Sequence, residues 1–440
     1  MRHVYLILAC VPAALAGAPR AGDAMNVWIA PGRAGRGLRP AERQLRGLPA
    51  VVEVTGRPAP AAACISTAFG AGNMERLMIE LTSRERIGRI LRREPVDRIG
   101  LCESFWGDTK ARWVADGHLA EEDSLEDHFG LDIRRSGGFT LAAWLDYKEE
   151  IVEETDETKL VRNPNGAVLR WWKGKSGTPE HVDFLVKDRA GWAEHIKPHL
   201  TDPAGYRKRM NLDAYRAARQ DCAERGLFLA WAGLNVFECM HPVCGHENML
   251  IGMIDDPAWV KDMCDTYAEL LVNLMEIEFA EAGEPDGIWF YEDMGFKGKP
   301  FMSPAMYKEL VWPAHKRTFE YAHSRNLPVI VHSCGYVEPL VPGLIEAGMD
   351  CLQAIEVKAG MDLLQLKRDY GEHIAFMGGV DVRPLVANDR DAIRAELETK
   401  LPAAMAGGGY CLHSDHSIPN QVDYETYRYF VDLGLEIGTY

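Results

Sequence analysis

The sequence lacks an excess of basic residues. Its 440 residues include 49 Lys and Arg against 65 Asp and Glu, which gives a formal net charge of −16 at pH 7. Phosphate backbones and anionic lipid surfaces repel such a chain, so nucleic acids and membranes are excluded as main partners and we expect a small-molecule substrate. The 47% hydrophobic share over this length suffices for one large α/β barrel or for two to three smaller domains.

A dense cysteine framework and a phosphate-binding loop are also missing. The ten cysteines are scattered between Cys10 and Cys411, unlike those of small secreted proteins, so we expect reduced thiols in a cytoplasmic enzyme. No glycine-rich phosphate loop opens any of the expected helices. Gly407–Gly409 comes before a strand rather than after one, so we interpret it as a turn.

Residues 1–80 differ in composition from the rest of the chain. They hold nine Arg, no Lys and five Asp or Glu, a local charge of +4, which leaves −20 on the remaining residues. Met1–Ala18 has the shape of a signal peptide and is too short and interrupted for a membrane span. We expect residues 1–80 to be a disordered extension, either an export signal with a linker or, as the thiol-rich body favours, a misassigned start before Met74 or Met78.

From Leu81 onward, strand-like and helical patterns alternate. Thr82 and Glu85 form a capping box at the start of a helix that Pro95 ends. Apolar runs predict strands at Arg98–Cys102, Leu227–Ala232, Gly287–Tyr291, Pro328–Val331, Cys351–Ala354, Ile374–Met377 and Tyr410–Leu412. Helical patterns between them include Trp259–Ala282, Pro304–Ser324, Tyr336–Ala347, Met361–Tyr370, Asp391–Met405 and Tyr424–Leu435.

This alternation predicts an α/β fold. The predicted strands are too apolar to expose one face to solvent, which indicates a parallel sheet covered by helices. The number of units over residues 81–440 favours a closed (β/α)8 TIM-type barrel, with a doubly wound sheet as the alternative. A longer insert separates the first strands, and within residues 151–174 it has a hairpin pattern around Asn163–Gly166.

Polar residues gather where the predicted strands end. They are Glu103, Asn235, Glu292, Asp293, His332, Cys334, Glu356, Asp381, His413, Ser414, Asp415 and His416. In a barrel these carboxyl ends meet at one mouth, where the chemistry of such folds occurs. Single members have simpler interpretations, since Asp381 is placed to cap a helix and Glu356 to be solvated. Together they predict an acidic, metal-capable pocket.

His332 and Cys334 are the first candidates for metal ligands. They lie two residues apart at the end of a buried strand, so their side chains point the same way. Imidazole and thiolate are typical zinc ligands, although a capping histidine and a packed cysteine are the structural alternative. His416 is the third candidate ligand, with His413, Asp415 and Glu292 behind it.

A second group of potential ligands follows the strand that ends near Gly233. It contains Cys239, His241, Cys244 and His246. The spacing fits no common zinc ribbon, and Pro242 indicates an irregular loop. We therefore interpret this group as structural or substrate-facing rather than as a metal site.

Four motifs together are similar to a known family. They are 327-LPVIVHSCGYVEPLVPGLIEAGMD-350, 361-MDLLQLKRDYG-371, 375-AFMGGVDVRPL-385 and 407-GGGYCLHSDHSIP-419. In this order and spacing they make the stretch from Leu81 to the C-terminus resemble the uroporphyrinogen decarboxylase superfamily, which includes the corrinoid-dependent methyltransferases. The resemblance implies a (β/α)8 barrel, in agreement with the strand–helix alternation.

The segment after the first strand departs from the decarboxylases. Those enzymes carry an Arg-rich segment there that grips the carboxylates of the substrate. Here the stretch 101-LCESFWGDTKARWV-114 has only Lys110 and Arg112 as basic residues, and Glu103 and Asp108 would repel a tetrapyrrole with eight carboxylates. This departure favours the methyltransferase branch.

In the methyltransferases, zinc is held by a His-x-Cys pair and by a third ligand, usually Cys, after the last strand. His332 and Cys334 match the pair, and His416 stands at the third position. His416 also matches a histidine of the decarboxylases, so this position does not separate the branches.

The resemblance implies zinc-assisted methyl transfer between a corrinoid and a thiol or pterin acceptor. No cobalamin-binding signature appears in this chain, so the corrinoid is expected on a partner protein. Members of the superfamily are often dimers, which makes a homodimer an expected state. The expected catalytic residues are Glu103, Glu292, Asp293 and His416, and the expected substrate-binding residues are Trp106, Trp231, Asn235, Glu356, Asp381, His413 and Asp415.

Two alternatives remain open at this stage. One is cofactor-free decarboxylation of a porphyrinogen in porphyrin metabolism, in which bound acids orient the substrate and a general acid protonates the pyrrole carbon. The other is a non-catalytic barrel that binds a corrinoid or tetrapyrrole.

Overall fold

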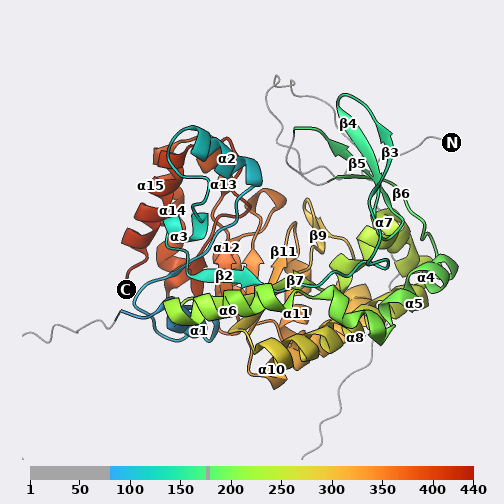
Figure 1. Ribbon diagram of the computed structural model, residues 1–440. Coiled ribbons are helices and arrows are strands. Elements are labelled where there is room, and N and C mark those ends of the chain that lie inside the picture. The colour runs from blue at the N-terminus through green and yellow to red at the C-terminus, as the bar shows by residue number, and fades with distance from the viewer. Residues whose placement is uncertain (1–79, 175–178) are drawn as a thin grey trace, which may run out of the picture. The chain divides into compact units, whose positions relative to one another are not determined.

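The computed structural model describes residues 80–174 and 179–440 (Figure 1). The predicted N-terminal extension, apart from Glu80, lies outside the described residues. Within the described ranges, no helix is both long enough and apolar enough to cross a membrane.

An eight-stranded parallel sheet forms the centre of the fold. Its strands are β1 (Gly100–Leu101), β2 (Ile133–Ser136), β7 (Phe228–Leu234), β8 (Gly287–Tyr291), β11 (Val329–Ser333), β12 (Cys351–Ala354), β13 (Ala375–Gly378) and β14 (Tyr410–Leu412). They are hydrogen-bonded in the order β1-β14-β13-β12-β11-β8-β7-β2. The amide of Asp132, next to β2, donates to the carbonyl of Leu101 at 2.8 Å, which links the two edge strands. The sheet is thus nearly closed into the (β/α)8 barrel that the sequence predicts.

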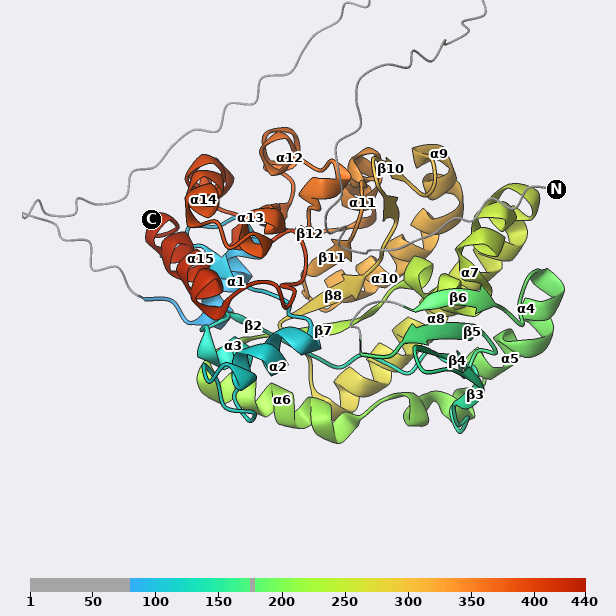
Figure 2. The same cartoon turned by 90° about the horizontal axis from the view of Figure 1, so that it is seen from above.

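Helices surround this sheet (Figure 2). They are α2 (Gly107–Ala115), α3 (Leu125–His128), α6 (Leu212–Arg225), α7 (Val236–Asp255), α8 (Pro257–Ala282), α9 (Pro304–Met306), α10 (Trp312–Ser324), α11 (Val341–Ala347), α12 (Leu363–Tyr370), α13 (Val382–Val386), α14 (Arg390–Met405) and α15 (Tyr424–Ile437). The main hydrophobic core lies between their inner faces and the outer face of the sheet. This is the two-layer packing expected of a barrel whose strands are apolar on both faces.

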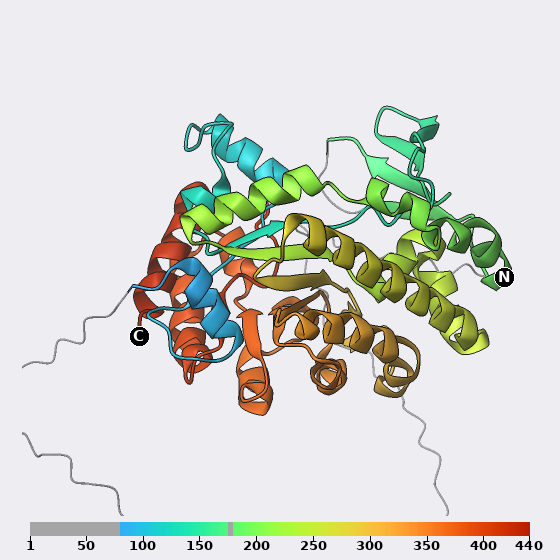
Figure 3. The same cartoon turned by 60° about the horizontal axis from the view of Figure 1, so that its bottom comes forward.

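Helix α1 (Ser83–Leu91) covers the end of the barrel at which the strands begin (Figure 3). It starts with the predicted capping box between Thr82 and Glu85. Its apolar face belongs to the cluster inside the barrel, through Ile87, Ile90 and Leu91. The bottom of the barrel is therefore filled, and only the mouth at the carboxyl ends of the strands is available for chemistry.

Strand β2 is the one barrel strand that the sequence does not predict. Its residues, 133-IRRS-136, contain two arginines and so do not form an apolar run. Arg134 pairs with Asp127 outside the sheet, while Arg135 lies on the other face of the strand. Because β2 precedes the insert, the insert lies between the second and third strands of the barrel.

The insert contains a four-stranded antiparallel sheet. Its strands, in spatial order, are β3 (Glu150–Glu154), β4 (Thr158–Arg162), β5 (Val168–Trp172) and β6 (Glu180–Asp183). The turn between β4 and β5 is the predicted one, since the side chain of Asn163 accepts hydrogen bonds from the amides of Asn165 and Ala167 at 2.9 and 3.0 Å. The helices α4 (Arg189–His195) and α5 (Lys197–Leu200) follow.

Candidate active site at the mouth of the barrel

The inner face of the barrel changes from apolar to polar towards the carboxyl ends of the strands. Its apolar layer consists of Cys102, Ile133, Phe228, Ala230, Trp289, Ile330, Cys351, Ala375, Met377 and Cys411, together with residues of α1. Because strand side chains alternate, residues two positions further along return to the same face. They are Arg135, Tyr291, His332, Gln353 and His413. These five side chains form a polar layer above the apolar one.

Asp293, His332 and Cys334 converge in this layer. One donor atom from each lies within 4.8 Å of the other two. The Nε2 atom of His332 is 3.4 Å from the Sγ atom of Cys334 and 3.4 Å from a carboxylate oxygen of Asp293. Asp293 joins the pair because β8 neighbours β11 in the sheet, with Tyr291 in register with His332.

The separations of these donor atoms fit a tetrahedral zinc ion. At ordinary zinc–ligand distances, a tetrahedron places an imidazole nitrogen about 3.6 Å from a thiolate sulfur and about 3.4 Å from a carboxylate oxygen. Both measured separations of 3.4 Å are close to these values. Three protein ligands leave a fourth position open, as in catalytic zinc sites.

Gln353 fixes the orientation of His332. Its side-chain oxygen accepts a hydrogen bond from Nδ1 of His332, which requires the proton on that nitrogen. The lone pair of Nε2 then faces Cys334 and Asp293. Such a hydrogen bond to the distal nitrogen is the usual support of a metal-binding histidine.

Gln353 also contacts a buried pair formed by His413 and Glu103. Its amide nitrogen is 3.2 Å from Nε2 of His413, and that same Nε2 is 3.2 Å from a carboxylate oxygen of Glu103. Burial raises the pKa of Glu103 to about 8 and lowers the pKa of His413 to about 3. At neutral pH the pair therefore carries its proton on the carboxyl group, and both residues are uncharged.

Arg135 is a cation with neutral partners. Its guanidinium donates to the hydroxyl of Ser104 at 2.8 Å and to the carbonyl of Glu103 at 2.9 Å. It also lies 3.4 Å from the hydroxyl of Tyr291. Among the described residues no carboxylate oxygen lies within 4.0 Å of it. The mouth of the barrel thus has a positive charge that makes no direct contact with an acidic side chain of the described residues.

A cavity of about 480 Å³ opens beside this layer. Tyr291 lines it together with Gly138, Lys208 and Leu234. Tyr291 also contacts the ring of His332 edge-on, with 5.3 Å between the ring centroids. The volume lies in the usual range for small-molecule sites. Tyr291 therefore contacts both the cavity and His332, one of the candidate ligands.

His416, the third zinc ligand that the sequence predicts, lies outside the ligand cluster. Its imidazole stacks on Trp106, with 6.1 Å between the ring centroids, and burial lowers its pKa. His416 follows β14, which β12 and β13 separate from β11 in the sheet. Among the described residues Asp293, and not His416, lies within 4.8 Å of both His332 and Cys334, and the role of His416 as a ligand stays a prediction.

Glu292, expected to be catalytic, anchors helices instead. Its carboxylate accepts hydrogen bonds from the amides of Phe237 and Glu238, at 2.7 and 3.0 Å, at the start of α7. It also pairs with the ring of His315 on α10. Alternation explains the difference from Asp293, since the side chain of Glu292 lies on the outer face of β8.

Trp231 and Asn235 are fully buried, and Trp231 packs behind the cavity wall against Phe139, with 5.0 Å between the ring centroids. The indole of Trp231 lies between the sheet and α8, where its nitrogen donates to Glu278 at 2.8 Å. Asn235 precedes α7, and its side-chain amide has no hydrogen-bond partner among the described residues. Neither side chain lines the cavity, so a contact of either one with a substrate stays a prediction.

Three further acidic candidates hold loops in place. A carboxylate oxygen of Glu356 accepts from the amide of Gly335 at 2.7 Å. Asp415 accepts from two backbone amides, those of Val357 and Val382, both at 2.8 Å, and burial raises its pKa to about 6. Asp381 caps α13 and pairs with Arg383, which is the simpler of its two interpretations.

Gln353, Tyr291 and Arg135 belong to the site although the sequence does not single them out. Gln353 and Tyr291 are the polar residues on the inner faces of otherwise apolar strands, 351-CLQA-354 and 287-GIWFY-291. Alternation from Cys351 and Trp289 would have indicated both. Arg135 has no comparable signal, because its strand is not recognisable without the barrel.

The fold and the polar mouth define a (β/α)8 barrel with an enzyme-like site. The family model of Uroporphyrinogen decarboxylase (URO-D) matches residues 235–436, which hold Asp293, His332 and Cys334. This stretch, slightly less than half of the chain, is therefore similar to the URO-D family.

Relatives similar in sequence include a methyltransferase and two decarboxylases. A methylated-thiol–coenzyme M methyltransferase of Methanosarcina mazei is 26% identical over 146 residues, 33% of this chain and 37% of the relative. A uroporphyrinogen decarboxylase of Streptomyces avermitilis is 27% identical over 183 residues, 41% of this chain and 48% of the relative. The chain thus spans less than half the length of either relative.

A solved structure shares the fold. It is a methyltransferase from Methanosarcina mazei, with a TM-score of 0.55 and 18% identity, and the match covers 81% of this chain and 99% of that chain. At this identity the likeness concerns the barrel and not the reaction.

Proposed function

We propose that this protein is a zinc-dependent methyltransferase that moves a methyl group between a corrinoid on a partner protein and a thiol or pterin. The observation that carries the proposal is the convergence of His332, Cys334 and Asp293 at the mouth of the barrel, at separations that suit zinc. The methyltransferase from Methanosarcina mazei, whose name includes a methylated thiol and coenzyme M, supports a thiol acceptor.

The three ligands would leave zinc with one open position for the acceptor. Zinc supplies Lewis acidity, which lowers the pKa of a coordinated thiol and so favours the nucleophilic thiolate. Gln353 keeps His332 in the tautomer that can bind a metal. The amide of Cys334 donates to Asp293 at 2.7 Å and holds that carboxylate beside the pair.

Other residues of the mouth would orient the acceptor. The cavity beside Tyr291 is large enough for a small thiol, and an anionic group of the acceptor would compete with Asp146, 3.0 Å away, for Lys208 on the cavity wall. Arg135, behind Tyr291, adds positive potential on the same side. The uncharged Glu103–His413 pair itself adds no net charge beyond Gln353.

Decarboxylation is the second candidate. The observation that favours it is Arg135, a cation without an acidic partner among the described residues, which is suited to a carboxylate of the substrate. Glu103 does not oppose this candidate in the way the sequence suggests, because it is 1% exposed and protonated at neutral pH. However, Lys110 and Arg112 are engaged on α2 with Glu121 and Asp423, so they do not replace the missing Arg-rich segment.

Metal analysis of the purified protein tests the ligand set. We expect one zinc ion per site in the wild type, with loss of that zinc in His332→Ala, Cys334→Ala and Asp293→Ala. His416→Ala is the discriminating control, because it keeps the zinc if Asp293 is the third ligand. Loss of zinc in His416→Ala with retention in Asp293→Ala would reverse that assignment.

Activity separates the candidates. The wild type is expected to demethylate methylcobalamin in the presence of coenzyme M or tetrahydrofolate, followed by the absorbance of the corrinoid. The zinc-free variants are expected to lose this activity. Wild-type protein that lacks zinc here and converts uroporphyrinogen would instead establish decarboxylation, and metal-free protein that only binds a tetrapyrrole would establish the binding barrel.

A further inference from the structure

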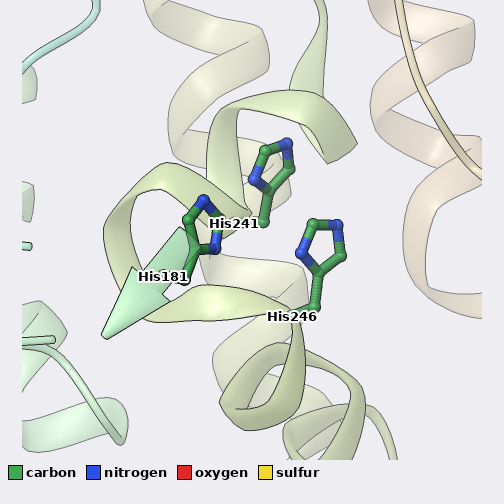
Figure 4. A group of neighbouring side chains, drawn as sticks. All are labelled: His181, His241 and His246. Carbon is green, nitrogen blue, oxygen red and sulfur yellow. The ribbon is translucent and has the colours of Figure 1, made fainter. Parts of the chain in front are cut away.

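A second group of histidines lies outside the active-site cluster. His181 comes from β6 of the insert, and His241 and His246 come from α7 (Figure 4). One ring nitrogen from each lies within 4.8 Å of the other two. The ring centroids of His241 and His246 are 4.3 Å apart, and that of His181 is 5.7 and 5.8 Å from them. Two elements far apart in the sequence therefore meet through three imidazoles.

A break in α7 brings His241 and His246 to the same side. Five residues of regular helix would place them about 140° apart around the axis. Gly245 interrupts the helix with φ 75° and ψ 158°, and Pro242 precedes it. A Cβ atom at Gly245 would lie 2.4 Å from the ring of Phe184, which directly follows β6. The glycine thus permits both the kink and the close approach of the insert.

Glu238 contacts His241 in the way that carboxylates commonly contact a metal-binding histidine. Its Oε1 atom is 2.8 Å from Nε2 of His241. The other ring nitrogen, Nδ1, is buried and has no hydrogen-bond partner among the described residues. A metal-binding histidine usually donates one ring N–H to a carboxylate and binds the metal through the lone pair of the other nitrogen.

The neighbouring thiols do not compete for this role. Burial raises the pKa of Cys244 to about 12 and raises the pKa of Cys239 well above its ordinary value. Both side chains pack in the core on the other side of α7. Burial and the nearby His241 lower the pKa of His181 to about 4 and that of His246 to about 3, so these two imidazoles are neutral at pH 7.

We propose that His181, His241 and His246 bind a divalent first-row transition metal such as Zn²⁺, Co²⁺ or Ni²⁺, and that this metal fastens the insert to α7. Three imidazoles with one open position suit these ions, whereas Mg²⁺ and Ca²⁺ prefer oxygen ligands. The site is separate from the zinc site of the proposed function and does not depend on it.

Glu238 connects the two sites. Its Oε2 atom accepts from the amide of Asp293 at 3.3 Å, while Oε1 faces His241. A metal on the three histidines would therefore hold Glu238, and through it the backbone that positions Asp293. Occupancy of the second site would steady a ligand of the first.

Metal stoichiometry in variants tests the proposal. Wild type is expected to bind two Zn²⁺ or Co²⁺ ions per chain after equilibrium dialysis, and His332→Ala/Cys334→Ala one. His181→Gln/His246→Gln is also expected to bind one, and the combined variant none. His373→Gln, an exposed histidine before β13, is the matched control and is expected to leave both ions in place. If the zinc site of the proposed function does not exist, wild type is expected to bind one ion and His181→Gln/His246→Gln none.

Thermal unfolding gives a readout that does not require activity. In the His332→Ala/Cys334→Ala background, added Zn²⁺ is expected to raise Tm, and His246→Gln is expected to abolish that rise. Circular dichroism of each metal-free variant establishes that it is folded. A Tm that responds equally with and without His246, or a second ion that persists in His181→Gln/His246→Gln, would overturn the proposal.

Discussion

The side-chain oxygen of Gln353 accepts a hydrogen bond from Nδ1 of His332, and this contact decides which ring nitrogen of the histidine is available for a metal. Both residues lie in register on adjacent parallel strands, β12 and β11. The pairing is therefore set by the sheet itself and needs no loop to hold it.

Gln353→Leu is expected to weaken zinc binding about 10- to 100-fold, because His332 loses the partner that fixes its tautomer and orientation. A competition titration with a chromophoric chelator measures the dissociation constant. Gln220→Leu, on the exposed face of α6, is the control and is expected to leave affinity unchanged. Equal affinity of Gln353→Leu and wild type would contradict the role assigned to Gln353.

The adjacent residues Glu292 and Asp293 are expected to respond differently to amide substitution. Asp293→Asn should lower zinc affinity with little change in stability. Glu292→Gln should keep the zinc but lower the free energy of unfolding by about 2 to 3 kcal/mol. The carboxylate now accepts hydrogen bonds from two backbone amides of α7, and the NH2 group of glutamine cannot accept one of them. Urea unfolding and metal analysis of both variants check this pair. Loss of zinc in Glu292→Gln with unchanged stability would restore Glu292 to the site.

Glu278 is expected to make stability depend on pH. It is fully buried beside Trp231, its second oxygen has no partner among the described residues, and burial raises its pKa to about 7 from 4.5. The unfolded chain therefore loses this proton at lower pH than the folded protein does. Ionisation of Glu278 therefore lowers the free energy of unfolding. This loss is absent below about pH 4.5, grows as the pH rises, and reaches about 3 kcal/mol above about pH 7.

Glu278→Gln removes this titration while it keeps an oxygen for the indole of Trp231. The variant is expected to match wild type at pH 5 and to be more stable by up to about 3 kcal/mol at pH 8. Urea unfolding at the two pH values measures the difference. An equal effect of the substitution at both pH values would show that Glu278 does not titrate in this range.

Gly245→Ala is expected to destabilise the protein and to disrupt the three-histidine group. The residue combines a backbone conformation reserved for glycine with a Cβ position 2.4 Å from the ring of Phe184. Together, strain and overpacking are expected to cost about 2 to 4 kcal/mol. Thermal or urea unfolding measures the cost.

Gly117→Ala is the matched control for Gly245→Ala. Gly117 also has a positive φ, of 81°, but nothing lies within 4 Å of its Cβ position. It is expected to cost about 1 kcal/mol and to leave metal binding unchanged. If the two substitutions lower the free energy of unfolding equally, the close approach of Phe184 to Gly245 does not contribute to the cost of Gly245→Ala.

Local patterns allow the elements and the first ligand pair to be predicted. The capping box at Thr82, the hairpin at Asn163 and the strand–helix alternation each depend on residues close together in the chain. His332 and Cys334 point the same way because strand side chains alternate, which spacing alone reveals. The strand Ile133–Ser136 escapes such patterns, because Arg135 belongs to the polar layer of the mouth and interrupts the apolar run.

By itself, the sequence determined that a barrel strand would carry an imidazole and a thiol to one mouth, because alternation along a strand is a local property. Only the tertiary structure decided the third member of that group. Asp293 follows β8, which neighbours β11, and so lies beside them, whereas His416 follows β14, which β12 and β13 separate from β11. The tertiary structure likewise brought His181 of the insert to His241 and His246. Contacts between strands and across a kinked helix depend on packing of the whole chain, which residue spacing does not encode.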